Sequence, residues 1–367
     1  MSTVKLSEII NYLDELAPPV YQENYDNSGL ICGNANLDLT GVMVTVDCTE
    51  QVVDEAIAAQ CNLIVAHHPI IFKGLKSLTG KNYVERTVIK AIQNNVAIFA
   101  IHTNLDNVLT GVNRKICEKI GLVNCSILAP KRRVLSKLVT FIPHESVDKV
   151  VRALHEAGAG NIGNYEQCSF RIQGTGTFLP NEKAKPHSGS VNKIEHVAET
   201  RVEMIFPSVL ESRVLQALKC SHPYEEVAFY LNVLDNEFQD VGSGMIGELA
   251  SPEQTGKFLT RIKGIFGSNL IRHTQPVKDQ IGKVAVCGGA GSFLLPLAKS
   301  ARADIFISAD FKYHEFFDAE KEIIIADVGH YESEQFTKEL LMENLTRKFP
   351  TFAVNFSKTD TNPISYL

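Results

Sequence analysis

Two segments of this chain show the same alternation of apolar and amphipathic stretches, and this repeat limits the folds that the chain can adopt. Residues 42–68 have the pattern of a strand, a helix and a second strand, and residues 283–310 have the same pattern. Another strand and helix follow each segment, the later helix running from about Ser333 to Leu345. Strands that alternate with helices predict a mainly parallel sheet with helices on its faces. We therefore expect an α/β fold in which two pseudo-equivalent strand–helix halves form one core domain.

Residues 131–236 lie between the two halves and contain a repeat of their own. Phe141-Ile142-Pro143 and Ile205-Phe206-Pro207 are each followed, at the same spacing, by an apolar helical run. A strand–helix–strand unit that occurs twice is the ferredoxin-like arrangement of an α+β domain. In the first of these helices, we expect Ser146 to cap the start and Gly158 to mark the end.

The position of this second unit predicts a discontinuous domain. Residues 1–130 and 237–367 are expected to form the core domain, and residues 131–236 an insert with its own hydrophobic core. Within the insert, residues 179–192 are rich in Pro, Gly, Ser and Lys, which predicts a long loop.

Composition and charge exclude several classes of protein. The net charge is −6 and no long basic run occurs, which argues against a general nucleic-acid binder. None of the eight cysteines forms a CxxC pair, so zinc knuckles and thioredoxin-type motifs are absent from the sequence. No apolar stretch approaches ~18 residues, which argues against a membrane span. Residues 1–5 lack the apolar region of a signal peptide, so we expect a cytoplasmic protein.

His67 and His68 follow the apolar run Leu63-Ile64-Val65-Ala66, and Pro69 comes directly after them. The run predicts a buried strand that ends at the two histidines. Ligands of open α/β sheets bind at the carboxyl ends of the strands. Each imidazole needs a partner for its N–H and for its lone pair, so two adjacent rings are hard to bury by chance. Packing in the core and a role as metal or substrate ligands are both open for this pair.

Two other expected strand ends carry side chains of the same kinds. His102-Thr103-Asn104-Leu105-Asp106 follows one, and His330-Tyr331-Glu332-Ser333-Glu334 follows the other. If a helix begins at His330, the four-residue spacing places Glu334 on the same face, one turn later. Asp106 can also simply occupy a turn, Glu334 can face solvent in a first helical turn, and His102 can lie at the site or pack beneath it.

The combination of imidazoles and carboxylates suits Zn²⁺, Mn²⁺, Fe²⁺ or Co²⁺. Five candidate ligands exceed the needs of one tetrahedral ion, and they fit two ions about 3.5–4 Å apart with a bridging carboxylate. The sequence therefore predicts a site for two divalent metal ions per chain.

The sequence resembles the Nif-three-like dinuclear-metal proteins of bacteria, the GTP cyclohydrolase 1 type 2 homologues. The resemblance covers nearly the whole chain. In the core it rests on motifs at five places, which are Asn27-Ser28-Gly29-Leu30, Ala66-His67-His68-Pro69 with Phe72-Lys73-Gly74, His102-Thr103-Asn104-Leu105-Asp106, Asp310-Phe311-Lys312-Tyr313-His314 and His330-Tyr331-Glu332-Ser333-Glu334. Gly176-Thr177-Phe178-Leu179-Pro180 and His222-Pro223-Tyr224-Glu225-Glu226 match the PII-like, or CutA-like, insert of the longer members.

The resemblance implies a ligand set and an assembly. The five metal ligands that it implies are His67, His68, Asp106, His330 and Glu334, with Glu334 able to bridge the ions. It also implies a homo-oligomer, often a hexameric ring. Because residues behind the ligands usually orient them, candidates for that role are His102, Asp310, Lys312 and His314.

Two functions of different classes remain open at this point. In the first, the protein is a metal-dependent hydrolase, with opening of the purine ring of GTP and loss of formate as the specific case. No nucleophilic Ser or Cys beside a base is evident, and no catalytic side chain is assigned. In the second, the protein is a metal-binding scaffold or regulator whose insert senses a small molecule or binds a partner. Residues 288–292 can cradle an anion or simply form a tight turn, and we favour the turn.

Overall fold

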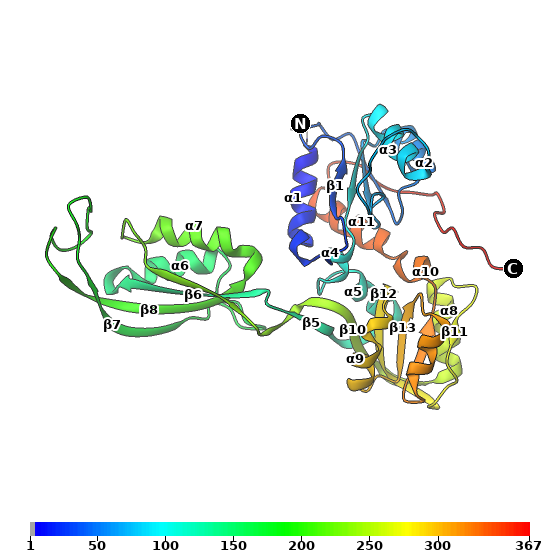
Figure 1. Cartoon of the computed structure of the whole chain (residues 1–367). Helices are drawn as coiled ribbons and strands as arrows, with labels where there is room; N and C mark the ends of the chain where they lie inside the picture. The colour runs from blue at the N-terminus through cyan, green and yellow to red at the C-terminus, as the bar shows by residue number, and fades with distance from the viewer. Residues whose placement is uncertain (1–3) are drawn as a thin grey trace. The chain divides into compact units, whose positions relative to one another are not determined.

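The computed structural model describes residues 4–367 and divides into two compact units (Figure 1). One unit joins the chain up to Pro130 to Asp240–Leu367, and the other is Lys131–Gln239. Residues 1–3 of the N-terminal segment considered above lie outside the described residues. None of the helices within residues 4–367 is long and apolar enough to cross a membrane.

The first sheet of the larger unit is built around three parallel strands. These strands, in which every residue is buried, are β2 (Val42–Thr45), β3 (Leu63–Ala66) and β4 (Ala97–Ala100). The sheet is completed by β15 (Val354–Phe356), parallel to β2, and β1 (Gly29–Cys32), antiparallel to β4. One face packs against α2 (Glu50–Ala58) and α3 (Tyr83–Gln93). Burial on both faces explains why the strands are almost entirely apolar.

The second sheet repeats this plan with three parallel strands in chain order, β12 (Gln280–Ala290), β13 (Ile305–Ala309) and β14 (Ile324–Asp327). The other members are β10 (Glu237–Gln254), which is antiparallel to β12, β11 (Arg272–His273), which is antiparallel to β14, and β5 (Leu122–Arg132) at the far edge. The prediction of a mixed α/β fold is therefore confirmed.

The remaining helices of this unit flank the two sheets. They are α1 (Leu6–Leu16), α4 (Thr103–Asp106), α5 (Val112–Ile120), α8 (Thr255–Phe266), α9 (Leu295–Ser300), α10 (His330–Glu334) and α11 (Thr337–Lys348). The prediction of one helix from about Ser333 was wrong, because two helices, α10 and α11, cover this stretch. The first of them begins before Ser333. The Ser333 N–H donates to the Gly329 carbonyl at 3.0 Å, and the helix starts at His330.

The smaller unit has a single antiparallel sheet of four strands in the order β7-β8-β6-β9. Its elements follow one another as β6 (Leu135–Pro143), α6 (Val147–Glu156), β7 (Phe170–Phe178), β8 (Glu195–Pro207), α7 (Glu211–Ser221) and β9 (Phe229–Leu234). Both helices pack on one face of the sheet (Figure 1). Gly158 follows α6 with a φ of 98°, as predicted for a helix end. Ser146 occupies the N-cap position of α6, as predicted, but its side chain makes no capping hydrogen bond, and a 3-10 turn at His144–Ser146 leads directly into the helix.

Candidate metal centre

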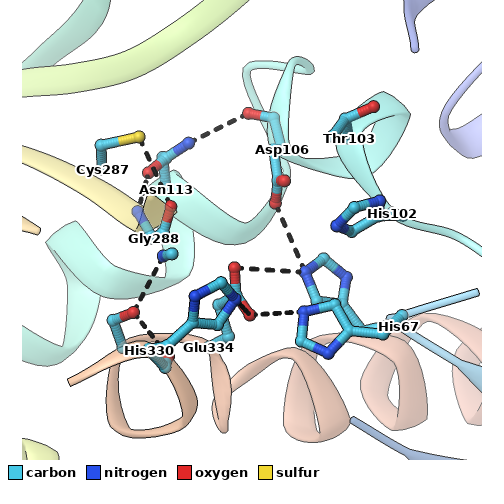
Figure 2. Close-up of polar contacts among 12 residues, drawn as sticks. His67, His102, Thr103, Asp106, Asn113, Cys287, Gly288, His330 and Glu334 are labelled. Atoms are coloured by element: carbon cyan, nitrogen blue, oxygen red, sulfur yellow. Dashed lines mark hydrogen bonds and ion pairs between the residues drawn. The ribbon is translucent and has the colours of Figure 1, made fainter. Parts of the chain in front are cut away.

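The predicted ligands follow strands of both sheets and lie close together (Figure 2). His67 and His68 directly follow β3, whereas Asp106 ends the short helix α4 that follows β4. His330 and Glu334 are the first and last residues of α10, which follows β14 of the second sheet. The three segments lie within the larger unit.

Glu334 lies at the centre of the cluster, and its two carboxylate oxygens face different partners. The Oε1 atom is 3.7 Å from Nε2 of His67. The Oε2 atom is 2.8 Å from Nε2 of His68 and 3.1 Å from Nε2 of His330. Glu334 belongs to two groups of possible donors, one with His67 and Asp106 and the other with His68 and His330. Within each group, the donor atoms all lie within 4.8 Å of one another. One carboxylate common to two donor groups is the arrangement that a bridged pair of ions requires.

Hydrogen bonds at Nδ1 hold four imidazole rings in place. The acceptors are the Ile101 carbonyl for His67 at 2.9 Å, Asp47 for His68 at 2.7 Å, Asp26 for His102 at 2.7 Å and Asp310 for His330 at 2.6 Å. Because each acceptor takes the proton on Nδ1, the neutral ring presents a lone pair at Nε2. Carboxylates and carbonyls behind metal-bound histidines orient the ring in this way.

The atoms that face the centre of the cluster lack hydrogen-bond partners. Among the described residues, Nε2 of His67, Nε2 of His68, Oδ1 of Asp106 and Oε2 of Glu334 are buried and without one. Such atoms are costly to bury, because water no longer solvates them. Nε2 of His68, for example, lies 2.8 Å from Oε2 of Glu334. A nitrogen lone pair and a carboxylate oxygen at this distance repel each other unless a proton or a cation lies between them. The donor set therefore fits divalent metal ions.

The ionisable groups of the cluster have pKa values that depart from their ordinary ranges. Burial lowers the pKa of His68, but the carboxylates of Glu334 and Asp47 outweigh this effect and raise it to about 10. Burial likewise lowers the pKa of His330, and Asp310 and Glu334 outweigh it and raise the value to about 11. Burial raises the pKa of Glu334, but the surrounding imidazoles hold it well below its ordinary value. These shifts favour the protonated rings of His68 and His330 and the ionised carboxylate of Glu334.

The glycine at 289 makes room for this carboxylate, and Gly288 precedes it. A Cβ atom at Gly289, whose φ is +62°, would lie 2.3 Å from Oε1 of Glu334. The N–H groups of both glycines donate to side chains, at Gly288 to Asn113 and at Gly289 to Ser333, each at 2.9 Å. Because these two N–H groups are used within the protein, they do not form an anion cradle.

The structure brings together some of the other candidates and separates others. His102 lies beside His67 and His68, with which it forms a third group of possible donors. Asp310 contacts His330 directly. Lys312 and His314 belong to none of these groups. Lys312 directly precedes the 3-10 helix at Tyr313–Ala319, and its N–H donates to Glu315. His314 lies in that helix, exposed, with its ring against Tyr313 and Phe317.

Asp26 and Asp47 orient His102 and His68, and neither was predicted from the sequence. Asp47 follows β2, so its position at a strand end gave the same signal as that of His67. Asp26 lies before β1, in a segment without periodicity, and offered no comparable signal.

A cavity of about 420 Å³ opens over the cluster. Its wall includes His68, Asp106, His330 and Glu334, and three exposed aromatic side chains, Tyr25, Phe72 and Phe293. None of the described residues that line it is Lys or Arg. A ligand in this cavity would therefore find aromatic surface and metal-binding groups, with no fixed cation among the lining side chains.

Comparison with known proteins shows the family of this chain. A family model described as Duf34/NIF3 (NGG1p interacting factor 3) matches residues 4–363. A Bacillus subtilis (strain 168) protein named "GTP cyclohydrolase 1 type 2 homolog" is 36% identical over 375 residues, covering 100% of this chain and 99% of that protein. A Mycobacterium leprae protein of the same name is 35% identical over 338 residues, covering 90% and 87%.

Solved structures of similar proteins share the fold. A Bacillus cereus protein described as related to NIF3 superposes with a TM-score of 0.88 at 35% identity, and all of both chains is covered. A Staphylococcus aureus protein superposes with a TM-score of 0.79 at 29% identity, again over 100% of both chains.

Proposed function

Because the chain belongs to the Duf34/NIF3 family, we propose that it is a hydrolase with a dinuclear centre of divalent metal ions. The proposed ligands are His67, His68, Asp106, His330 and Glu334, and the ions are Zn²⁺, Mn²⁺, Fe²⁺ or Co²⁺. The observation that carries the proposal is the pair of donor groups sharing Glu334, whose inward-facing atoms are buried without partners. A closed structural site would fill all coordination positions with protein atoms, whereas five ligands shared by two ions leave positions for water and substrate.

The chain's own residues have distinct parts in this proposal. Bound divalent ions lower the pKa of coordinated water and polarise the bond that is attacked. His67 and Asp106 would hold one ion and His68 and His330 the other, with Glu334 shared. Asp47 and Asp310 keep the rings of His68 and His330 fixed, with Nε2 directed inward. Tyr25, Phe72 and Phe293 offer apolar surface to a flat substrate at the mouth of the cavity.

The specific reaction that we propose to test first is hydrolytic opening of the imidazole ring of a guanine nucleotide, with release of the C8 carbon as formate. The names of the relatives and the aromatic rim of the cavity support this choice. The lining provides no Lys or Arg for a triphosphate, so any phosphate would depend on the metal ions for its binding. Guanosine and GMP therefore belong in the substrate panel beside GTP.

A second candidate function is a metal-binding scaffold or regulator, in which the insert is a PII-like domain that senses a small molecule or binds a partner. The β-α-β-β-α-β connection of the smaller unit and a large cavity within it favour this reading. By resemblance to the family, we also propose a homo-oligomer, specifically a hexameric ring, which light scattering would test.

One experiment separates the two functions. Metal content is measured by elemental analysis, and the same preparation, reloaded separately with Zn²⁺, Mn²⁺, Fe²⁺ and Co²⁺, is assayed for formate release from the purine panel. Turnover that depends on metal and is lost in His330→Ala supports the hydrolase. Full metal occupancy without turnover of any purine compound would support the scaffold.

A further inference from the structure

The smaller unit contains a cavity of about 640 Å³. Its described lining residues all fall between 141 and 230, and none of them is a candidate metal ligand. We propose that this cavity binds an organic cation, an ammonium group carried on an apolar or aromatic skeleton. Two segments that stood out in the sequence, at 176–180 and 224–226, line this cavity together. The proposal is independent of the hydrolase reaction.

The floor of the cavity is the face of the sheet opposite α6 and α7. Side chains alternate along a strand, so Leu138 and Ile142 of β6 pack under the helices while Phe141 faces the other way. Glu199 of β8 pairs with Gly174 of β7 on this floor. A Cβ atom at the neighbouring Gly176 would lie 2.1 Å from Oε2 of Glu199. The glycine therefore leaves the space that the carboxylate occupies.

Glu199 is held in the cavity by a chain of hydrogen bonds. It is 7% exposed, and its Oε1 accepts a hydrogen bond from the Tyr224 hydroxyl at 2.8 Å. The Tyr224 N–H donates to Nδ1 of His222 at 3.1 Å, and Nε2 of His222 donates to the Phe141 carbonyl at 3.0 Å. Burial lowers the pKa of His222, in keeping with the neutral ring that these two bonds require. The buried carboxylate is thus positioned by groups that add no positive charge.

Aromatic rings line the same cavity as this carboxylate. The ring centroids of Phe141 and Tyr230 are 5.6 Å apart, and the two rings are nearly perpendicular, in an edge-to-face contact. The ring of Tyr224 lies 6.1 Å from that of Phe178 and 6.0 Å from that of His187. Faces of Tyr and Phe rings attract cations, and quaternary ammonium ligands are recognised by such cages.

The charge of the lining also favours a cation. Glu225 and Glu226 add two carboxylates to that of Glu199. Among the described lining residues, Arg201 is the one Lys or Arg side chain, and its guanidinium is paired with Glu203 at 2.7 Å. The backbone N–H of Lys185 donates to Oε1 of Glu225 at 2.7 Å, which links the loop at residue 185 to this part of the cavity lining. A cavity of this size takes a small organic molecule and not only a bare ion.

The test uses three ligands that share a phenylethyl skeleton and differ in charge, 2-phenylethylammonium, 2-phenylethanol and phenylacetate. Binding to the full-length protein is measured by isothermal titration calorimetry near pH 7, where an aliphatic amine is protonated. We expect the cation to bind at least about tenfold more tightly than the alcohol, and phenylacetate not to bind. Glu199→Gln keeps the shape of the side chain and should weaken the cation about tenfold while leaving the alcohol unchanged.

Glu182→Gln is the matched control, because it removes the same charge from the loop at 179–194 at a position outside the cavity lining. Its affinities should equal those of the wild type. Should Glu199→Gln fail to fold, as judged by its thermal transition, Glu225→Gln takes its place with the same expected direction. The proposal is overturned if none of the three ligands binds, if phenylacetate binds as well as the amine, or if the amine binds equally to wild type and the folded Glu-to-Gln variant.

Discussion

Oε2 of Glu334 lies 3.1 Å from Nε2 of His330, one helical turn earlier, although both residues belong to a helix only five residues long. Gly329 precedes this helix with a φ of 98°, and a Cβ atom there would lie 2.2 Å from Oε2 of Glu332. The turn at Gly329 therefore starts the helix early enough to place both proposed ligands on one face. Asp310 fixes the other side of the His330 ring, so the pair is oriented before any ion binds.

Removing a histidine should remove metal. The wild-type protein should contain about two divalent ions per chain, as a bridged centre requires. We expect His67→Ala and His330→Ala each to lose at least one ion, because either change empties one donor group. Elemental analysis by plasma mass spectrometry measures the ratio. His314→Ala, which alters an exposed histidine outside the cluster, should retain wild-type content. Unchanged metal in both ligand variants would contradict the assignment.

Glu334→Gln should be more severe than Asp310→Asn. The amide keeps the shape of Glu334 but removes the one charge shared by both donor groups, so metal occupancy and any hydrolase activity should fall together. Asp310 acts only through the His330 ring, and a change behind a ligand typically costs about 10–100-fold in affinity or activity. Competition with a fluorescent chelator gives the affinities. The reverse order of severity would mean that Asp310 is a ligand and that Glu334 is not.

The strand ends could be predicted from the sequence, because buried parallel strands are continuous apolar runs and their carboxyl ends meet at one edge. This reasoning predicted His67 and Glu334 as candidate ligands, and the structure places both in one group of possible metal donors. It did not find Asp26, because its hydrogen bond to His102 joins positions far apart in the chain and depends on the path of an irregular segment. Lys312 was implied by the resemblance and not by this reasoning, and in the structure it precedes the 3-10 helix at Tyr313–Ala319, where its N–H donates to Glu315.

Metal affinity should rise with pH. The carboxylates around His68 and His330 outweigh burial and raise the two pKa values to about 10 and about 11, from an ordinary value of 6.5. Ions must displace protons from these rings, so binding should release protons and tighten between about pH 7 and 10. Calorimetric titrations of the metal-free protein in buffers of different ionisation enthalpy count the released protons. An affinity independent of pH would show that the rings are already neutral in the metal-free protein.

The same raised pKa values predict the stability of the metal-free protein. A group whose pKa is higher in the folded state stabilises the fold fully below its unfolded value, and this contribution is lost as the pH rises through the folded value. The melting temperature of the metal-free protein should therefore fall between about pH 7 and 10, and that of the metal-loaded protein should fall less. Parallel thermal melts of the two forms provide the comparison.

Deletion of the smaller unit should leave the metal centre intact, because no candidate ligand lies within Lys131–Gln239. Arg132 and Glu237 are joined by an ion pair of 2.7 Å, so the two chain ends at the excision are adjacent and a short Gly-Ser linker can connect them. We expect about two ions per chain in the shortened protein. Loss of all metal from a shortened protein that still shows a cooperative thermal transition would mean that the smaller unit is needed to form the site.

A single methyl group at position 289 should disrupt the centre. In Gly289→Ala the new Cβ would lie 2.3 Å from Oε1 of Glu334, and the φ of +62° would also strain a non-glycine residue. Because the Glu334 carboxylate lies between the rings of His67, His68 and His330, a shift away from residue 289 would alter both donor groups, so metal content should fall along with stability. Gly264→Ala is the matched control, since its Cβ would meet nothing within 4 Å on the exposed side of α8. This control should keep its metal and gain roughly 0.5–1 kcal/mol of stability from the better helix former. Elemental analysis and chemical denaturation of the two variants measure both effects, and full metal content in Gly289→Ala would show that Glu334 has freedom to shift.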